Sequence, residues 1–301
     1  MIEAAVEDDR VVLLTGDLGF MVLEPFADRF PSRFYNMGVA EANMLGVAAG
    51  MAQQGLVPYC YSIATFASMR GYEQFRDGAV LHNLAVRIVG VGGGFGYGSA
   101  GPTHWALEDL SIMRVQPGVT VAAPGCDEQV AAALRVLHTL PGPAYLRLTK
   151  DSVSVPELSG RFSLGRLELI SKGGRVALVT TGGMTLETIR GARLLAERGV
   201  QPTVVQVPCI APAPIAGLGA VAAAHPVVVS VEDHYSTGGL GSLVAEAIAE
   251  VGAGTRLIRL GVDAPSDGRC GDDHWLRSRH GLTAEAICSV AATAVESRPA
   301  A

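Results

Sequence analysis

The sequence has little charge and lacks the features that mark several protein classes. Only 17% of its 301 residues are charged, and the net charge at pH 7 is −6. Nucleic-acid surfaces need clustered Lys and Arg, and no such cluster occurs. No apolar run reaches the ~20 residues of a membrane span, and the first residues show no signal-peptide pattern. These absences predict a soluble, cytoplasmic protein that does not bind nucleic acid or membranes.

Cysteine is also scarce and scattered. The sequence contains no C-x-x-C motif, and its five cysteines are Cys60, Cys126, Cys209, Cys270 and Cys288. Their odd number and wide spacing predict reduced thiols, with neither a disulfide framework nor a metal site.

Apolar residues and glycine are abundant instead. Hydrophobic residues make up 49% of the chain, which also has 37 glycines, a composition typical of compact α/β enzymes. Short β-branched runs predict strands at residues 11–15, 57–61, 86–91, 119–122, 144–148, 175–181, 203–207, 227–231 and 255–260. Longer periodic stretches between them predict helices at 41–54, 68–83, 106–115, 127–140, 184–198, 215–224, 240–251 and 283–293. This alternation predicts parallel sheets with helices on both faces.

The alternation is interrupted once, which predicts two successive three-layer α/β/α domains. The first domain is predicted at residues 1–155 and the second at 171–301. Residues 156–170, with Pro156 and mixed polarity, form the predicted linker. Residues 263–279 are polar and glycine-rich, and are predicted either to be mobile or to cover a neighbouring surface.

Three polar motifs lie just beyond predicted strands of the first domain, where open α/β sheets bind ligands. They read R-F-Y-N-M-G-V-A-E-A-N at 33–43, T-F-A-S-M-R-G-Y-E-Q at 65–74 and G-S-A-G-P-T-H-W-A-L-E-D at 98–109. Glu41 in the first motif opens a helix. Taken alone, it is equally well explained as a favourable partner of the helix dipole.

In this order and spacing, the motifs resemble the pyrimidine-binding domain of transketolases and deoxyxylulose phosphate synthases. The similarity is greatest to the separate C-terminal subunits of two-component transketolases. It continues into the second half, where V-E-D-H at 231–234 and G-G-L-G-S at 238–242 resemble a signature of the family's C-terminal domain.

The resemblance implies that the chain binds thiamine diphosphate. By position, Glu41 is the catalytic carboxyl that hydrogen-bonds the cofactor's aminopyrimidine and must exchange a proton near neutral pH. Phe66 matches the aromatic residue that stacks on the pyrimidine, and Met69 and Tyr72 are expected to line the same pocket. Asp17, which ends the first strand, is a further candidate for this pocket, although an N-cap role explains it equally well.

The substrate end of the site follows the family pattern less closely. His104 matches the histidine that faces the substrate and handles its protons, but it could also merely anchor the glycine-rich loop. Ser99 stands in a loop that has lost the family's sugar-binding Asp, and His234 is a further candidate substrate ligand. Lys150 replaces a phosphate-binding Arg, and a lysine is a point charge without the bidentate geometry of Arg. These changes predict a specialised two-carbon transfer, as in secondary metabolism, from a ketose or 2-oxo acid to an aldehyde-type acceptor.

The resemblance also implies that this chain lacks the half of the cofactor site that binds the diphosphate. The family binds the diphosphate through Mg²⁺ on a domain with a G-D-G…N motif, and this sequence has no G-D-G. A partner subunit is therefore expected to supply Mg²⁺ and the pyrophosphate site, in an α2β2 heterotetramer. Two alternatives remain at this point, namely the beta subunit of a 2-oxo acid dehydrogenase and a non-catalytic regulatory subunit.

Overall fold

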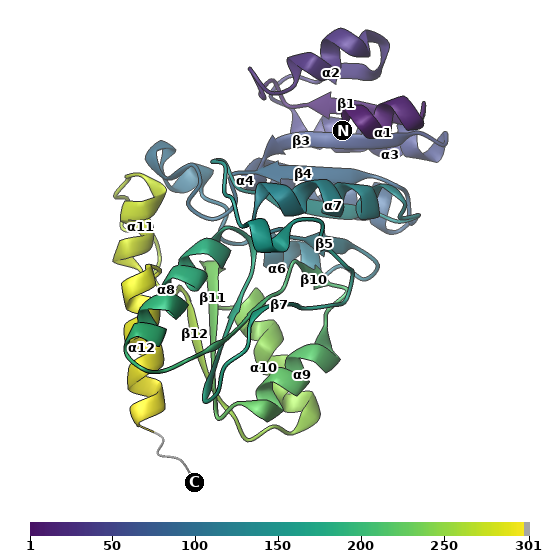
Figure 1. Ribbon diagram of the computed structural model, residues 1–301. Helices are drawn as coiled ribbons and strands as arrows, with labels where there is room; N and C mark the ends of the chain where they lie inside the picture. Colours follow the sequence, from purple (N-terminus) through teal and green to yellow (C-terminus); the bar gives the residue numbers. More distant parts are fainter. Residues whose placement is uncertain (298–301) are drawn as a thin grey trace.

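The computed structural model describes residues 1–297 and contains two β-sheets, each covered by helices on both faces (Figure 1). The fold therefore confirms the predicted pair of three-layer α/β/α domains. Within the described residues, no helix is long and apolar enough to cross a membrane.

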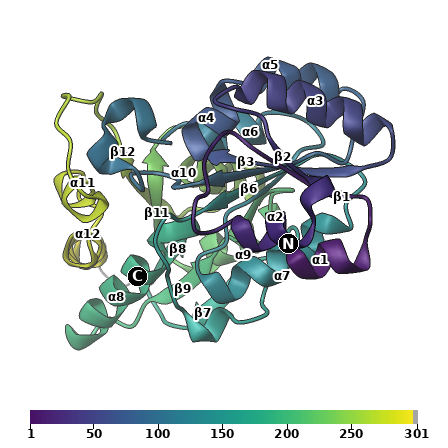
Figure 2. The same ribbon diagram turned by 90° about the horizontal axis from the view of Figure 1, so that it is seen from above.

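The first sheet has seven strands in the order β10-β5-β6-β4-β3-β1-β2, and all neighbours are parallel except β10 and β5. Its strands are β1 (Val11–Thr15), β2 (Phe34–Asn36), β3 (Val57–Ile63), β4 (Arg87–Val91), β5 (Thr120–Ala122), β6 (Ala144–Leu148) and β10 (Cys209–Ala211). Its helices are α1 (Ile2–Glu7), α2 (Glu24–Arg29), α3 (Glu41–Gln53), α4 (Ala64–Met69), α5 (Tyr72–Gln74), α6 (Asp109–Arg114) and α7 (Asp127–His138). Viewed from above, α3 and α5 lie on one face of this sheet and α1 and α7 on the other (Figure 2).

The second sheet has five strands in the order β12-β11-β8-β9-β7, with only β7 antiparallel to its neighbour. Its strands are β7 (Glu168–Ser171), β8 (Val176–Thr180), β9 (Thr203–Gln206), β11 (Val227–Tyr235) and β12 (Arg256–Val262). Its helices are α8 (Thr185–Glu197), α9 (Ile215–Ala224), α10 (Leu240–Val251), α11 (Asp273–Arg279) and α12 (Ala284–Glu296). Helices α8 and α12 cover one face, and α9 and α10 cover the other (Figure 1).

Short helical turns occupy several of the loops. They are η1 (Pro31–Arg33), η3 (Gly98–Ala100), η4 (Pro102–His104), η5 (Pro156–Leu158), η6 (Gly182–Met184) and a π-helical turn, η2 (Phe75–Val80). The single helix predicted over residues 68–83 is therefore three elements, α4, α5 and η2. Helix α4 ends just before Gly71 and α5 begins just after it. A Cβ atom at Gly71 would lie only 2.5 Å from Leu45 Cδ1. This close packing against α3 brings residues 64–71 next to Glu41.

The two domains share a continuous interior. One cluster of buried apolar side chains includes Met44 of α3, Val179 of β8 and Leu243 of α10. Polar contacts cross the same junction: Arg147 of β6 donates to the carbonyl of Asp233 at 2.8 Å, and the amide of Phe95 donates to the Asp233 carboxylate at 3.3 Å. The junction therefore holds the loops of the first domain against the second.

The cysteines give a direct test of this packing. Cys270 is exposed, whereas the other four thiols are buried, and burial raises the pKa of Cys209 to about 12. Because the thiolate is the reactive form, buried thiols react slowly. We expect a thiol reagent to modify one cysteine rapidly in the native chain and five after denaturation. Substitution of Cys270 by Ser should remove the rapid reaction, and rapid modification of a second thiol would contradict the structure.

Candidate active site

Glu41 is a buried carboxylate at the start of α3. Its residue is only 1% exposed. The hydroxyl of Ser62, near the end of β3, donates to Oε1 at 2.9 Å, and Arg70 Nη1 donates to Oε2 at 2.9 Å. A Cβ atom at Gly16 would lie 3.3 Å from Oε1. The sequence thus brings the ends of β1 and β3 and the start of α3 around one carboxylate.

Aromatic rings lie beside this carboxylate. The rings of Phe66 and His104 make an edge-on contact, with centroids 5.0 Å apart and planes at 66°. The Arg70 guanidinium carbon lies 3.7 Å from the centroid of the Phe66 ring. Because Arg70 contacts both Glu41 and Phe66, and Phe66 contacts His104, the structure brings the predicted residues Glu41, Phe66 and His104 together.

The other candidate cofactor residues surround this centre in different ways. Met69 is 45% exposed, so its side chain reaches the surface. The Tyr72 hydroxyl donates to the carbonyl of Ile112 at 2.8 Å, which ties α5 to α6. Asp17 accepts a 2.8 Å hydrogen bond from the Asn36 side chain, linking the ends of β1 and β2. Of these, only Met69 presents an unengaged side chain at the surface.

The candidate substrate residues lie on neighbouring loops of the first domain. Ser99 is exposed on η3, one turn before His104. The Lys150 ammonium nitrogen lies 5.0 Å from the centroid of the Tyr97 ring, and burial raises the pKa of Tyr97. Lys150 also lines a small cavity between the domains. Ser99 and Lys150 are thus both accessible on loops that follow strands of the first sheet.

The segment 263–279 covers this loop region. A Cβ atom at Gly98 would lie 2.5 Å from Leu276 Cδ1, and one at Gly101 would lie 3.2 Å from Cys270 Sγ. Helix α11 runs beside these loops (Figure 1). Of the two roles predicted for residues 263–279, mobility or covering a neighbouring surface, the structure shows the second.

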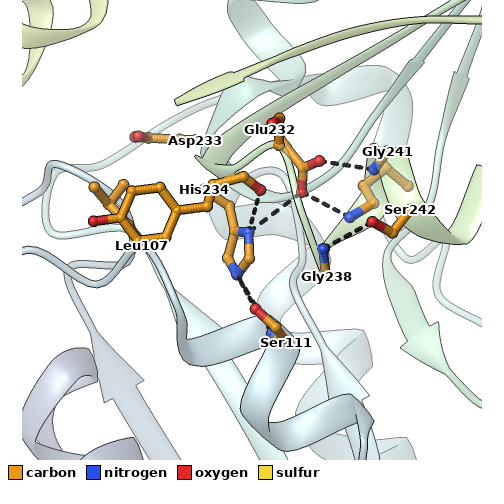
Figure 3. Close-up of polar contacts among 12 residues, drawn as sticks. Leu107, Ser111, Glu232, Asp233, His234, Gly238, Gly241 and Ser242 are labelled. Atoms are coloured by element: carbon orange, nitrogen blue, oxygen red, sulfur yellow. Dashed lines mark hydrogen bonds and ion pairs between the residues drawn. The ribbon is translucent and has the colours of Figure 1, made fainter. Parts of the chain in front are cut away.

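His234 lies apart from these loops, fully buried in the domain junction (Figure 3). Its Nε2 is 2.9 Å from the hydroxyl of Ser111 on α6, and its Nδ1 is 2.6 Å from the carbonyl of Tyr235. Glu232 beside it accepts hydrogen bonds of 2.7 Å from the amides of Leu240 and Gly241 (Figure 3). Burial raises the pKa of Glu232. Through Glu232 and His234, these contacts connect β11 to α10 and α6. None of them involves Glu41 or His104.

Two residues of the site carried no role in the sequence analysis. Ser62 precedes the T-F motif by three positions and has no distinctive pattern of its own. Arg70 stands inside the T-F-A-S-M-R-G-Y-E-Q motif, and that position was the available signal. Only the fold shows that both side chains bind Glu41.

Comparisons with known proteins agree with this arrangement along the chain. The transketolase pyrimidine-binding domain matches residues 1–155, and the transketolase C-terminal domain matches residues 165–287. The chain belongs to the transketolase family.

Two relatives that this chain matches over most of their length are named as transketolase subunits. An apulose-4-phosphate transketolase subunit from Actinobacillus succinogenes is 34% identical, with 94% of this chain and 91% of that protein covered. A 6-deoxy-6-sulfo-D-fructose transketolase subunit from Clostridium sp. is 36% identical, covering 97% and 90%. A solved split-gene transketolase, described as an inactive β4 tetramer, is 32% identical, covers 98% and 95%, and has a TM-score of 0.87. These similarities favour a transketolase subunit over a 2-oxo acid dehydrogenase subunit or a non-catalytic protein.

The side chains around Glu41 fit the pyrimidine half of thiamine diphosphate. A buried carboxylate supplies the hydrogen-bonding group, and the adjacent Phe66 supplies an aromatic face. Within residues 1–297, no group of three or more His, Cys, Asp or Glu could hold a metal ion.

Proposed function

We propose that this chain is the pyrimidine-binding subunit of a two-component, thiamine-diphosphate-dependent transketolase. It works with a partner that carries the G-D-G…N motif, Mg²⁺ and the diphosphate site, in an α2β2 assembly. The observation that carries the proposal is the buried carboxylate of Glu41, which lies beside Phe66. Thiamine diphosphate, when bound, supplies the carbon–carbon bond chemistry.

The residues of this chain then have distinct tasks. Glu41 binds the aminopyrimidine and exchanges a proton with it, and its burial keeps water away from that hydrogen bond. Phe66 orients the ring by stacking, and Met69, Tyr72 and Asp17 shape the rest of the pocket. His104, held edge-on against Phe66, moves a proton at the substrate hydroxyl or carbonyl. Its partner Thr103, with Oγ1 3.0 Å from Nδ1, orients the imidazole.

The exposed face of α3 supports assembly with a partner. Gly46 and Gly50 lie one turn apart on this face, and a Cβ atom at either would meet nothing within 4 Å. Another backbone can approach closely at such positions. The same helix begins at Glu41, so a partner packed here would lie next to the cofactor pocket. The related chain described as an inactive β4 tetramer also supports the need for a second component.

The substrate we propose is a modified ketose with an anionic end. The relatives named above act on apulose-4-phosphate and on 6-deoxy-6-sulfo-D-fructose, both of which carry such a group. Lys150 is an exposed cation in the loop after β6 and could bind a phosphate or sulfonate as a point charge. Ser99, exposed on η3, contacts the sugar hydroxyls in this proposal. Under this proposal His234 acts from the junction by holding α6 in place.

Partner dependence is the test of this proposal. We expect the purified chain to show no ketol transfer with thiamine diphosphate, Mg²⁺ and a panel of phosphorylated and sulfonated ketoses. Addition of a partner that carries G-D-G…N should produce turnover. Product formation is followed by coupled assay and confirmed by mass spectrometry. Turnover by the rigorously purified chain alone, or a complex that transfers acyl groups to a lipoyl domain instead, would contradict the proposal.

A further inference from the structure

Arg70 occupies the place that the proposed function gives to the cofactor's pyrimidine ring. Its guanidinium lies over Phe66, with the carbon 3.7 Å from the ring centroid, and the same group donates to Glu41 Oε2 at 2.9 Å. A guanidinium is planar, stacks on aromatic faces and donates hydrogen bonds in its own plane. An aminopyrimidine bound by Glu41 and Phe66 would make the same two kinds of contact. The Arg70 guanidinium therefore makes the two contacts, stacking on Phe66 and donating to Glu41, that are expected of the aminopyrimidine.

Both oxygens of the Glu41 carboxylate accept a hydrogen bond in this arrangement. Oε1 of Glu41 accepts from Ser62, and Oε2 accepts from Arg70. Burying a carboxylate without partners is costly, so these two bonds stabilise Glu41 in a chain without cofactor. A ring nitrogen that donates to Glu41 while stacking on Phe66 would have to take the position of the guanidinium.

Arg70 can leave without movement of the backbone. Its amide donates to the Phe66 carbonyl at 3.1 Å, and a Cβ atom on the adjacent Gly71 would lie 3.0 Å from the Glu41 carbonyl oxygen, so the main chain here is closely packed. The Arg70 side chain, in contrast, is 43% exposed, while its partner Glu41 is 1% exposed. Rotation about the side-chain torsions is enough to carry the guanidinium into solvent.

We propose that Arg70 is a further residue of the cofactor site, which closes the half-site in the free chain and must swing away from Phe66 before the pyrimidine ring can bind. The inference rests on the proposed function. It explains how one chain keeps a buried carboxylate paired until the cofactor and the partner arrive. The ion pair is half-exposed, so water can replace it readily on the Arg70 side.

The test uses the isolated full-length chain and hydroxymethylpyrimidine, the aminopyrimidine half of thiamine, with binding measured by calorimetry or ligand-observed NMR. We expect Arg70→Met to bind this fragment about tenfold more tightly than the wild type, because no internal group competes. Arg76→Met is the matched control. Arg76 is similarly exposed and pairs with Asp77 at 2.5 Å on the same segment, and its loss should leave affinity unchanged.

Two further variants keep the inference falsifiable. Arg70→Lys retains a cation beside Glu41, so it should fold even if Arg70→Met does not. Because a lysine cannot cover Phe66 with a planar group, this variant should also bind more tightly than the wild type. Adding Glu41→Gln to either Arg70 variant should abolish the gain, which places the fragment at this site.

Equal affinity of wild type and both Arg70 variants would overturn the inference, as would a gain that persists without Glu41. Neither result bears on the proposed function, which is decided by turnover of the chain together with its partner.

Discussion

Replacing Glu41 by Gln is expected to lower kcat of the reconstituted two-chain complex by about 10²–10⁴-fold, the range for loss of a positioned acid–base group. The amide of Gln can still form hydrogen bonds, but it cannot exchange a proton with the aminopyrimidine. The site is closed enough that water is a poor substitute, since Glu41 is 1% exposed. Steady-state rates at saturating cofactor give the measurement, so that weaker cofactor binding is not mistaken for slower chemistry.

Glu7→Gln is the control for this substitution. Glu7 is an exposed glutamate at the end of α1, on the opposite face of the sheet from α3 (Figure 2). Its substitution removes the same charge and should leave kcat unchanged. If the Glu41→Gln complex keeps a rate within about threefold of the wild type, Glu41 is not the activating carboxyl, because the expected loss is far larger.

Replacing Arg147 by Met is expected to lower the free energy of unfolding by about 3–5 kcal/mol, the cost of removing one partner of a buried ion pair. Arg147 and Asp109 are 5% and 1% exposed, and Arg147 Nε lies 2.9 Å from Asp109 Oδ2. Arg147 also donates to the carbonyls of Ala106 and Asp233, so it joins the two domains. Without it, the Asp109 charge keeps only the hydroxyl of Tyr145, which donates at 2.6 Å.

Urea unfolding of the isolated chain, followed by circular dichroism, measures this loss. Arg190→Met is the control, because the Arg190–Glu187 pair at 2.6 Å lies on the surface, with Arg190 56% exposed. Such pairs contribute about 0.2–1 kcal/mol. Adding Asp109→Asn to Arg147→Met should recover part of the lost stability, since the uncompensated charge is gone. Similar unfolding midpoints for the Arg147 and Arg190 variants would show that the junction does not depend on this pair.

Periodicity predicted the central elements of the fold because those elements are buried and regular. Strand β1 was predicted with the bounds that the structure has, and all five of its residues are buried. Strand β10, only three residues long, was missed because its formation depends on pairing with β5 from a distant part of the chain. Strand β7 was missed for a similar reason. It lies partly in the predicted linker and exists through its antiparallel pairing with β9.

The candidate site was predictable where motifs follow strands, and not where contacts join distant side chains. Glu41, Phe66 and His104 come from three separate motifs, and parallel strands deliver such loops to one edge of a sheet. His234 also stands in a motif, but the structure buries it against Ser111, a partner 123 positions away. The local sequence around position 234 does not indicate that Ser111 is the partner of His234. The same limit applies to Arg70, because its position in a motif indicates that it lies near the site but does not indicate that it pairs with Glu41.

The antiparallel strand β10 makes the two domains inseparable as parts. It comes from the second half of the chain yet forms the outer strand of the first sheet, beside β5. A cut in the linker would strip this strand away and leave β5 with an unpaired edge, which invites aggregation. An attempt to transfer the proposed substrate preference to another transketolase should therefore exchange the whole chain. An exchange of the pyrimidine-binding domain alone would leave β10 behind, so the smallest unit to exchange is the whole subunit.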